Sequence, residues 1–201
     1  MTGLSAILGT VSAVYGVVII AVTALQWLLA EYVTPFCMGP LMLIMQVALL
    51  VLIAVSVASL PLQIRRDWRL GILPLAINLG VLATLWFVPF TRLWLALEFR
   101  MNWQGYNEVI TLVETGEIQP TGQGLATLPP EYCRVSRDCE ILIDTSDEVT
   151  RVFFFTFRGV LDNFSGYMYR SDSRPPELLD FGGDWHEVKE VKPHWYWMSS
   201  Y

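Results

Sequence analysis

Histidines and carboxylates are the first side chains to ask about when a sequence is read for chemistry, and this one holds two histidines, His186 and His194. If their segments formed a hairpin, the two imidazoles could approach each other, with Asp184 and Glu187 as oxygen ligands for a metal ion. The alternative is that both are polar residues on the surface of a sheet. Because the spacing matches no established metal-binding motif, we predict no metal site.

Nucleophilic catalysis would need a nucleophile beside a positioned base. Ser165 stands in the run NFSGY, which lacks the first glycine of the G-x-S-x-G turn, and a serine on a strand is the better interpretation. Asp144, Asp147 and Glu148 lack the full oxygen cage and the glycine of an EF-hand loop, so we read them as a solvated turn. The sequence therefore predicts no catalytic, cofactor-binding or metal-ligating residue, and a protein that is not an enzyme.

The composition divides the chain into two halves. Of its 201 residues (22.8 kDa), 54% are hydrophobic and 16% are charged, against about 25% charged in an average soluble domain. Residues 1–100 hold five arginines and three acidic residues, whereas residues 101–201 hold eight basic and sixteen acidic residues, a net charge of −8. The first half is typical of membrane spans, and the acidity of the second argues against nucleic acid as a partner.

Three uncharged stretches in the first half are each long enough to cross a bilayer, for which about 20 apolar residues suffice. The predicted spans cover residues 3–30, 41–62 and 70–88. A juxtamembrane helix is predicted over residues 90–103, either as an interfacial helix or as a bent continuation of the third span. Pro89 should kink or end the third span. The spans lack the ionisable side chains that proton and ion pathways use, which argues against a pump or transporter. Gln26, Gln46 and Asn78 are expected to hydrogen-bond between helices, and weak ligation of a pigment metal is the alternative.

Arginines near the span ends predict the topology. Three spans place the two chain ends on opposite sides of the membrane. The loop over residues 63–69 holds three arginines on the side of the N-terminus, whereas Arg92 and Arg100 lie on the other side. The positive-inside rule then predicts a cytoplasmic N-terminus and an extracytoplasmic C-terminal domain.

Cysteine spacing bears on the same question. Cys133 and Cys139 are close enough in sequence for a tight loop to join them in a disulfide, which would fit an oxidising compartment. Two unrelated thiols are the alternative. Cys37 lies apart from both, in the first connector.

Residues 104–201 are predicted to form a soluble α+β domain with one helix and about five mostly antiparallel strands. Apolar residues from Tyr106 to Val113 recur at helical spacing, and Gly116 stands where a left-handed cap would end that helix. Residues 119–130, with three prolines and two glycines, predict a loop. Runs of β-branched and aromatic residues predict strands over residues 140–144, 149–157, 164–170, 185–191 and 195–199.

The second predicted strand carries aromatic side chains on both faces. Phe153, Phe155 and Phe157 are expected on one face, with Val152 and Phe154 on the other. Neither face of such a strand could be left in water. The domain helix can cover one face, and the second layer could be the chain's own long loop, the membrane surface or a partner protein.

The run FRGVLDNFSGYMYRSD and the later HWYW resemble a segment of uncharacterised bacterial membrane proteins, cyanobacterial ones especially. The resemblance covers the C-terminal part of the chain. It implies a bacterial inner membrane or a thylakoid-type membrane and carries no activity.

The remaining hypothesis for function is a non-enzymatic accessory or assembly subunit of a larger membrane complex, with other integral membrane subunits as partners. Contacts are expected through the spans and through Trp94, Trp103, Trp195 and Trp197. The alternative is a membrane-anchored, extracytoplasmic binding or sensing module. Three spans exceed what a simple tether needs, which favours the subunit.

Overall fold

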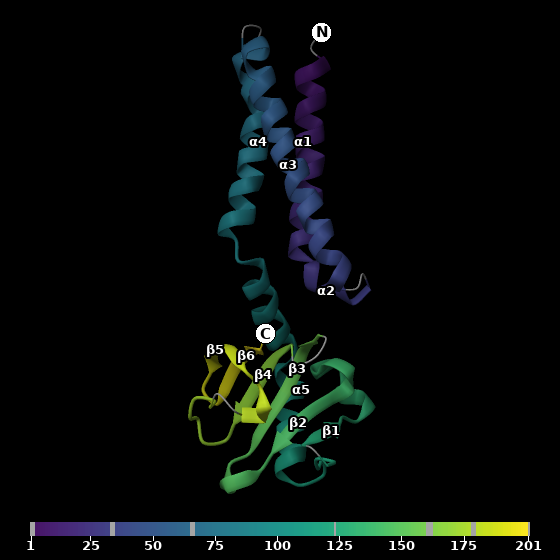
Figure 1. Ribbon diagram of the computed structural model, residues 1–201, viewed down its shortest axis with the longest axis vertical. Helices are drawn as coiled ribbons and strands as arrows, with labels where there is room; N and C mark the ends of the chain where they lie inside the picture. The colour runs from purple at the N-terminus through teal and green to yellow at the C-terminus, as the bar shows by residue number, and fades with distance from the viewer. Residues whose placement is uncertain are drawn as a thin grey trace. The chain divides into compact units, whose positions relative to one another are not determined.

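The computed structural model describes residues 3–32, 35–64, 67–122, 124–159, 163–177 and 180–200. The chain divides into two compact units, Met1–Glu98 and Phe99–Tyr201, and each is treated by itself. The first is helical, and the second combines a six-stranded antiparallel sheet with helices (Figure 1). This is the predicted combination of a membrane helical region and a small α+β domain.

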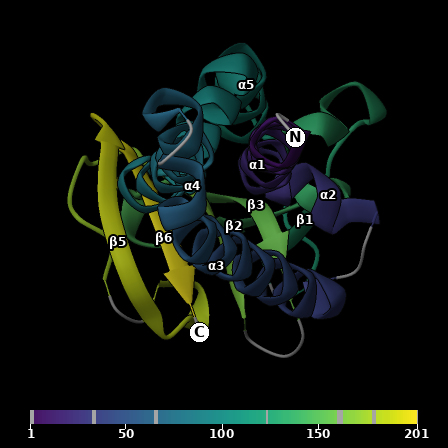
Figure 2. The same ribbon diagram turned by 90° about the horizontal axis from the view of Figure 1, so that it is seen from above.

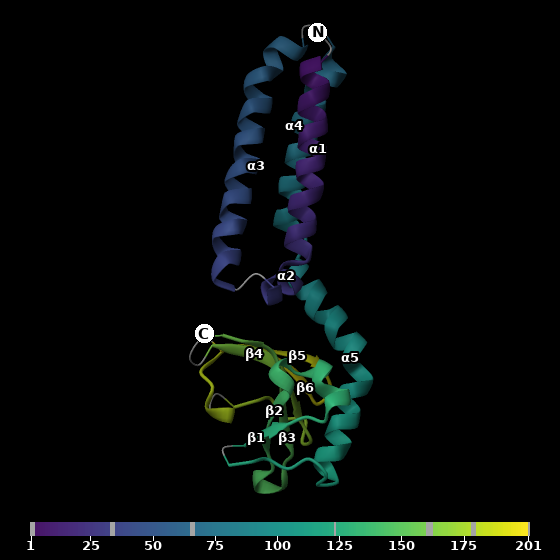
Figure 3. The ribbon, with the colours of Figure 1, turned by 90° about the vertical axis from the view of Figure 1, so that its right-hand side faces the viewer.

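Three helices of the first unit are long and apolar enough to cross a membrane, which makes the chain a multi-pass membrane protein. They are α1 (Gly3–Ala24), α3 (Pro35–Ile64) and α4 (Trp68–Phe87). Seen from above, they group around one another (Figure 2). The start of α1, the end of α3 and the start of α4 lie at one end of this unit, and the short α2 (Gln26–Tyr32) lies at the other (Figure 3).

The helices begin and end at residues that differ from the limits of the predicted spans, and local interactions explain the differences. The predicted first span is divided at Leu25 into α1 and α2. The second begins at Pro35 rather than at residue 41, because proline fits the first turn of a helix. Asp67 caps α4, since its Oδ1 accepts from the backbone N–H of Arg69 at 3.0 Å. Arg65 and Arg66, on which the topology prediction partly depends, lie outside the described residues.

Close packing and one polar contact join the three long helices. Gly16 of α1 lies so near α4 that a Cβ there would sit 2.5 Å from Val81 Cγ2. Asn78 of α4 is fully buried, and its Nδ2 donates to Ser56 Oγ of α3 at 3.0 Å. Ser56 donates in turn to Leu52 O at 2.7 Å. Asn78 therefore makes the predicted interhelical hydrogen bond.

The predicted juxtamembrane helix and domain helix are one continuous helix, α5 (Phe90–Glu114), and the boundary between the two units falls within it. Pro89 interrupts the chain between α4 and α5, as expected. No proline follows until α5 has ended, so nothing breaks the helix between its two predicted parts. Gly116 has φ +78° and its N–H bonds to Val113 O at 3.0 Å, which confirms the predicted cap.

The sheet is antiparallel throughout, in the order β1-β2-β3-β4-β6-β5. Its strands are β1 (Leu125–Thr127), β2 (Glu140–Asp144), β3 (Arg151–Arg158), β4 (Phe164–Arg170), β5 (Trp185–Lys192) and β6 (Trp195–Ser200). Five of them match predicted strands. The sixth, β1, is three residues long and falls inside the predicted loop.

Both faces of the sheet are buried. On one face α5 supplies Phe99, Tyr106 and Val109 to a core that contains Val152 and Phe154. On the other face a second core contains Phe153, Phe155, Met168, Trp185, Tyr196 and Met198. The predicted alternation along β3 is therefore confirmed for residues 152–155.

Phe157 departs from that alternation. The register of β3 and β4 shifts between Phe155 and Phe157, so Phe157 pairs with Ser165, which lies on the α5 side of the sheet. The bulged residue reverses the side on which later side chains project. The prediction that Phe157 shares a face with Phe153 is wrong, because alternation cannot reveal a bulge.

Candidate functional site

Aromatic side chains at the two ends of α4 mark the membrane-facing part of the first unit. Trp68 at its start is 60% exposed, and Trp86 and Phe87 at its end are 81% and 79% exposed. Trp68 and Trp86 are eighteen positions apart, which corresponds to about 27 Å of helix, close to the hydrocarbon thickness of about 30 Å. The guanidinium of Arg69 lies 5.4 Å from the Trp68 ring centroid. Aromatic and arginine side chains at this separation are typical of the two membrane–water interfaces.

In the second unit, the second layer over the sheet comes from the chain itself. We call residues 171–184, between β4 and β5, the lid segment. Phe181 of this segment packs against the second core, and its ring centroid lies 6.1 Å from that of Phe153. Trp185 Nε1 donates to Asp180 O at 2.9 Å. Of the three layers considered from the sequence, the chain's own loop is the one that covers these aromatics.

A buried ion network holds the lid segment to the sheet. Arg151 on β3 and Arg170 on β4 are directly opposite in register, with side chains 10% and 3% exposed. Asp180 of the lid segment lies between them, its Oδ2 2.9 Å from Arg170 Nη1 and its Oδ1 3.7 Å from Arg151 Nε. Arg170 also binds both carboxylate oxygens of Asp172 at 3.0 Å. Arg151 Nη1 donates to Asp144 Oδ2 at 2.9 Å.

Ionisation of these groups is set by their partners. Hydrogen bonds from the Arg170 guanidinium lower the pKa of Asp172 to about 2, and the same hydrogen bonds raise the pKa of Arg170. Burial by itself would raise the pKa of Asp144, but hydrogen bonds from Ser146 and the charge of Arg151 outweigh this effect and lower the pKa. The acidic turn after β2 is thus tied to an arginine and to the backbone, as a structural turn.

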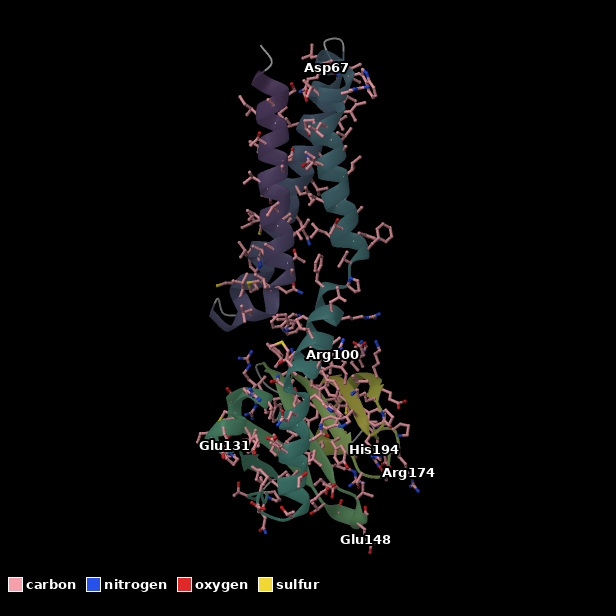
Figure 4. All side chains as sticks on the ribbon, turned by 180° about the vertical axis from the view of Figure 1, so that it is seen from behind. Asp67, Arg100, Glu131, Glu148, Arg174 and His194 are labelled. Carbon is pink, nitrogen blue, oxygen red and sulfur yellow. A yellow bond between two sulfur atoms is a disulfide. The ribbon has the colours of Figure 1, made fainter. Side chains whose placement is uncertain are left out.

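His194 lies beside Ser173. Ser173 Oγ is 2.8 Å from Nδ1 and 3.0 Å from Nε2, so it lies on the lone-pair axis of neither ring nitrogen. Nδ1 also lies 2.9 Å from the Arg170 carbonyl oxygen, which can only accept a hydrogen bond. Tyr196 OH donates to Ser173 O at 2.9 Å. These contacts anchor the start of the lid segment, near Arg174 (Figure 4).

The two histidines do not share a site. Trp185 pairs with Ser200 and Lys192 with Trp195, so His186 lies at one end of the β5–β6 hairpin and His194 in its turn. A strand of eight residues is about 26 Å long. Among the described residues no group of three histidine, cysteine, aspartate or glutamate side chains is placed to hold a metal ion.

The four candidate contact tryptophans are in different surroundings. Trp94 belongs to the helical unit. Trp195 is 2% exposed and lies in the domain core, 5.7 Å from Trp103 between ring centroids, so its ring is not available to a partner. Trp103 and Trp197 are half-buried, and Lys192 Nζ lies 3.9 Å from the Trp103 ring centroid. Only Trp103 and Trp197 of the second unit keep surface for contacts.

Cys133 and Cys139 form a disulfide, with their Cα atoms 4.2 Å apart. The bonded loop is tied to the sheet through Ser136, whose Oγ accepts from the backbone N–H of Phe155 at 2.9 Å. This contact falls next to the bulge in β3. The disulfide therefore closes the loop that precedes β2, and Ser136 within this loop holds it against the central strand.

Comparisons with protein-family models, with curated proteins and with solved structures gave no match. The arginine–aspartate network was not predicted, because Asp144, Asp180 and the two arginines are scattered along the sequence. Arg151 begins β3 and Arg170 ends β4, but no pattern in the sequence indicated which carboxylates they would meet.

Proposed function

We propose that this protein is a non-enzymatic subunit of a larger membrane assembly, and that α3 contacts a partner subunit within the membrane. The observation that carries the proposal is the position of Gln46. This residue lies eleven residues into the apolar helix α3, and its side chain is exposed on the outside of the helical unit. Hydrocarbon cannot hydrogen-bond an amide, and burying one without a partner costs roughly 2 to 7 kcal/mol. A neighbouring transmembrane helix would satisfy it.

The packing of α3 supports the same proposal. Only 17% of its most apolar window is buried inside the chain. Met38 is buried near the start of the helix, and the later buried positions Leu49, Ser56 and Gln63 recur every seven residues along a single line. The rest of the helix, including Gln46, is left for lipid or for another protein.

The test compares two substitutions on the exposed side of α3. Full-length protein is purified from its native membranes in mild detergent, and co-purifying chains are identified by mass spectrometry. Gln46→Leu should reduce the yield of a stoichiometric partner, because the interhelical hydrogen bond is lost. Val47→Leu, a matched change at a neighbouring exposed residue, should not. If Gln46→Leu leaves the co-purifying chains unchanged, or if none is present in the wild type, the proposal is wrong.

We further propose that the domain is extracytoplasmic, in a bacterial inner or thylakoid-type membrane. The arginines of the loop over residues 63–69 support this topology, and a disulfide between Cys133 and Cys139 fits an oxidising compartment. The resemblance of the C-terminal segment to bacterial membrane proteins supports the kind of membrane.

A binding module is the second candidate, and the lid segment favours it. Arg151 and Arg170 hold the carboxylate of Asp180, so an external carboxylate could take its place if the lid segment moved away. Succinate is a suitable probe. Under this candidate succinate would raise the melting temperature of Asp180→Asn, in which the competing carboxylate is removed, more than that of the wild type. No difference between the two proteins would reject the module.

A further inference from the structure

The strand β5 is a long free edge of the sheet. It stands last in the strand order and pairs only with β6 among the described strands, and Figure 2 shows it as the outermost strand. Seven of its eight residues are exposed. The outer backbone groups of such a strand are a ready template for pairing with another chain.

Between its two irregularities β5 is regular. The register with β6 shifts between Trp185 and Glu187 and again between Glu190 and Lys192, and residues 187–190 pair in order with Ser199, Met198, Trp197 and Tyr196. Glu187 and Lys189 therefore project from the same face of the sheet, with the exposed Val188 between them on the opposite face. This regular stretch can accept a second strand.

The charges of this stretch are self-complementary in one antiparallel register. Residues that lie opposite each other in an antiparallel pair project from the same face of the sheet. When the two strands are identical and related by a two-fold axis, a residue therefore cannot lie opposite its direct neighbour in sequence. One residue must lie on the axis, opposite its own copy. With Val188 on the axis, Glu187 of each copy lies opposite Lys189 of the other. Centring the pair on Glu187, Lys189 or Glu190 instead sets like charges directly opposite each other. Val188 is the only centre in the regular stretch that avoids such repulsion.

We propose that two copies of this chain associate through β5, paired antiparallel with Val188 on the two-fold axis, so that their two sheets become continuous. The backbone of the free edge supplies the hydrogen bonds, and the two Glu187–Lys189 pairs select the register. Charged residues usually protect an edge strand from pairing, but their alternating signs here favour pairing with a second copy. The inference stands on β5 alone and does not depend on a partner at Gln46.

Charge reversal tests the register in the full-length protein in mild detergent, with the dimer dissociation constant measured by analytical ultracentrifugation. Glu187→Lys and Lys189→Glu should each weaken the dimer at least about tenfold, because each sets two like-charge pairs in place of two opposite-charge pairs. The double variant should regain wild-type affinity, and a mixture of the two single variants should form a heterodimer. Glu177→Lys, a reversal in the lid segment, should leave the constant unchanged.

A cysteine on the proposed axis gives an independent measurement in membranes. In a Cys37→Ser background, Val188→Cys should form a disulfide-linked dimer under mild oxidation, since directly opposed Cα atoms lie about 4.5 to 5.5 Å apart. Val191→Cys should not, because its two copies would lie about 20 Å apart along the strands. Three results would overturn the proposal. The wild type could be monomeric, or the charge variants could fail to weaken and restore the dimer as described. The third is crosslinking at Val191 but not at Val188. Adding Gln46→Leu should leave the Val188→Cys crosslink intact, which separates this dimer from the proposed partner contact.

Discussion

Removing the charge of Asp180 should loosen the lid segment and destabilise the C-terminal domain. The carboxylate is bound by two arginines whose side chains are 10% and 3% exposed, and it also accepts from the backbone N–H of Glu177 at 2.8 Å. Breaking one partner of a buried ion pair costs about 3 to 5 kcal/mol. Each arginine keeps a second carboxylate, Asp144 or Asp172, and asparagine keeps one acceptor oxygen. We therefore expect Asp180→Asn to lower the free energy of unfolding by about 2 to 4 kcal/mol.

Two readouts in detergent check this expectation. Chemical denaturation gives the loss of stability, and hydrogen exchange over residues 171–184 reports whether the lid segment opens first. The matched control is Glu177→Gln, which removes a charge from an exposed side chain in the same segment and should change stability by less than about 0.5 kcal/mol. If Asp180→Asn is as stable as the wild type and its lid segment exchanges no faster, the network does not hold the lid as described.

Four further outcomes are expected. Phe153→Ala, at a fully buried ring packed 5.2 Å from Phe155 and 5.3 Å from Trp185, should cost about 3 to 5 kcal/mol in denaturation, and a loss below about 1 kcal/mol would contradict the second core. The Cys133–Cys139 bond should appear in non-reduced peptide mass spectrometry, and two free thiols would contradict the disulfide. Removal of the bond should lower the free energy of unfolding by roughly 2 kcal/mol, because the loop it closes is short. The pKa of Asp172 is held at about 2 against an ordinary 3.8. Its ionised form therefore stabilises the fold above about pH 4, and this contribution should disappear as the pH falls to about 2. In Asp172→Asn the denaturation midpoint should change less with pH over this window than in the wild type, and equal pH dependence in the two proteins would refute the pairing. A cysteine introduced at the exposed Ser173 should react with a membrane-impermeant reagent on intact cells, whereas reaction only after lysis would reverse the proposed topology.

The sequence predicted elements whose signals are local. Gly116 ends α5 and Pro89 interrupts the chain before it, because positive φ and a missing N–H act on the residue itself. The apolar lengths of the three spans and the aromatic runs of five strands follow from the same kind of short-range pattern. The cap at Asp67 is equally local, since its side chain accepts from Arg69 and Leu70 just ahead in the chain, although it was not predicted.

Features that depend on contacts between distant parts of the chain could not be predicted from the sequence. The strand β1 is too short to have a pattern of its own and is defined by pairing with β2. The bulge before Phe157 appears only against β4. Asp180 stands in a stretch rich in proline and glycine that has the composition of a surface loop, yet two arginines from β3 and β4 bind it. The role of the lid segment therefore emerges only from tertiary structure.

The subunit proposal rests most directly on what accompanies the chain in its own membrane. The decisive measurement is the native mass of the particle extracted in mild detergent, with every polypeptide in it identified. We expect this 22.8 kDa chain to occur together with at least one different integral membrane protein in fixed stoichiometry. A particle that contains only this chain, as one copy or two, would contradict the proposal.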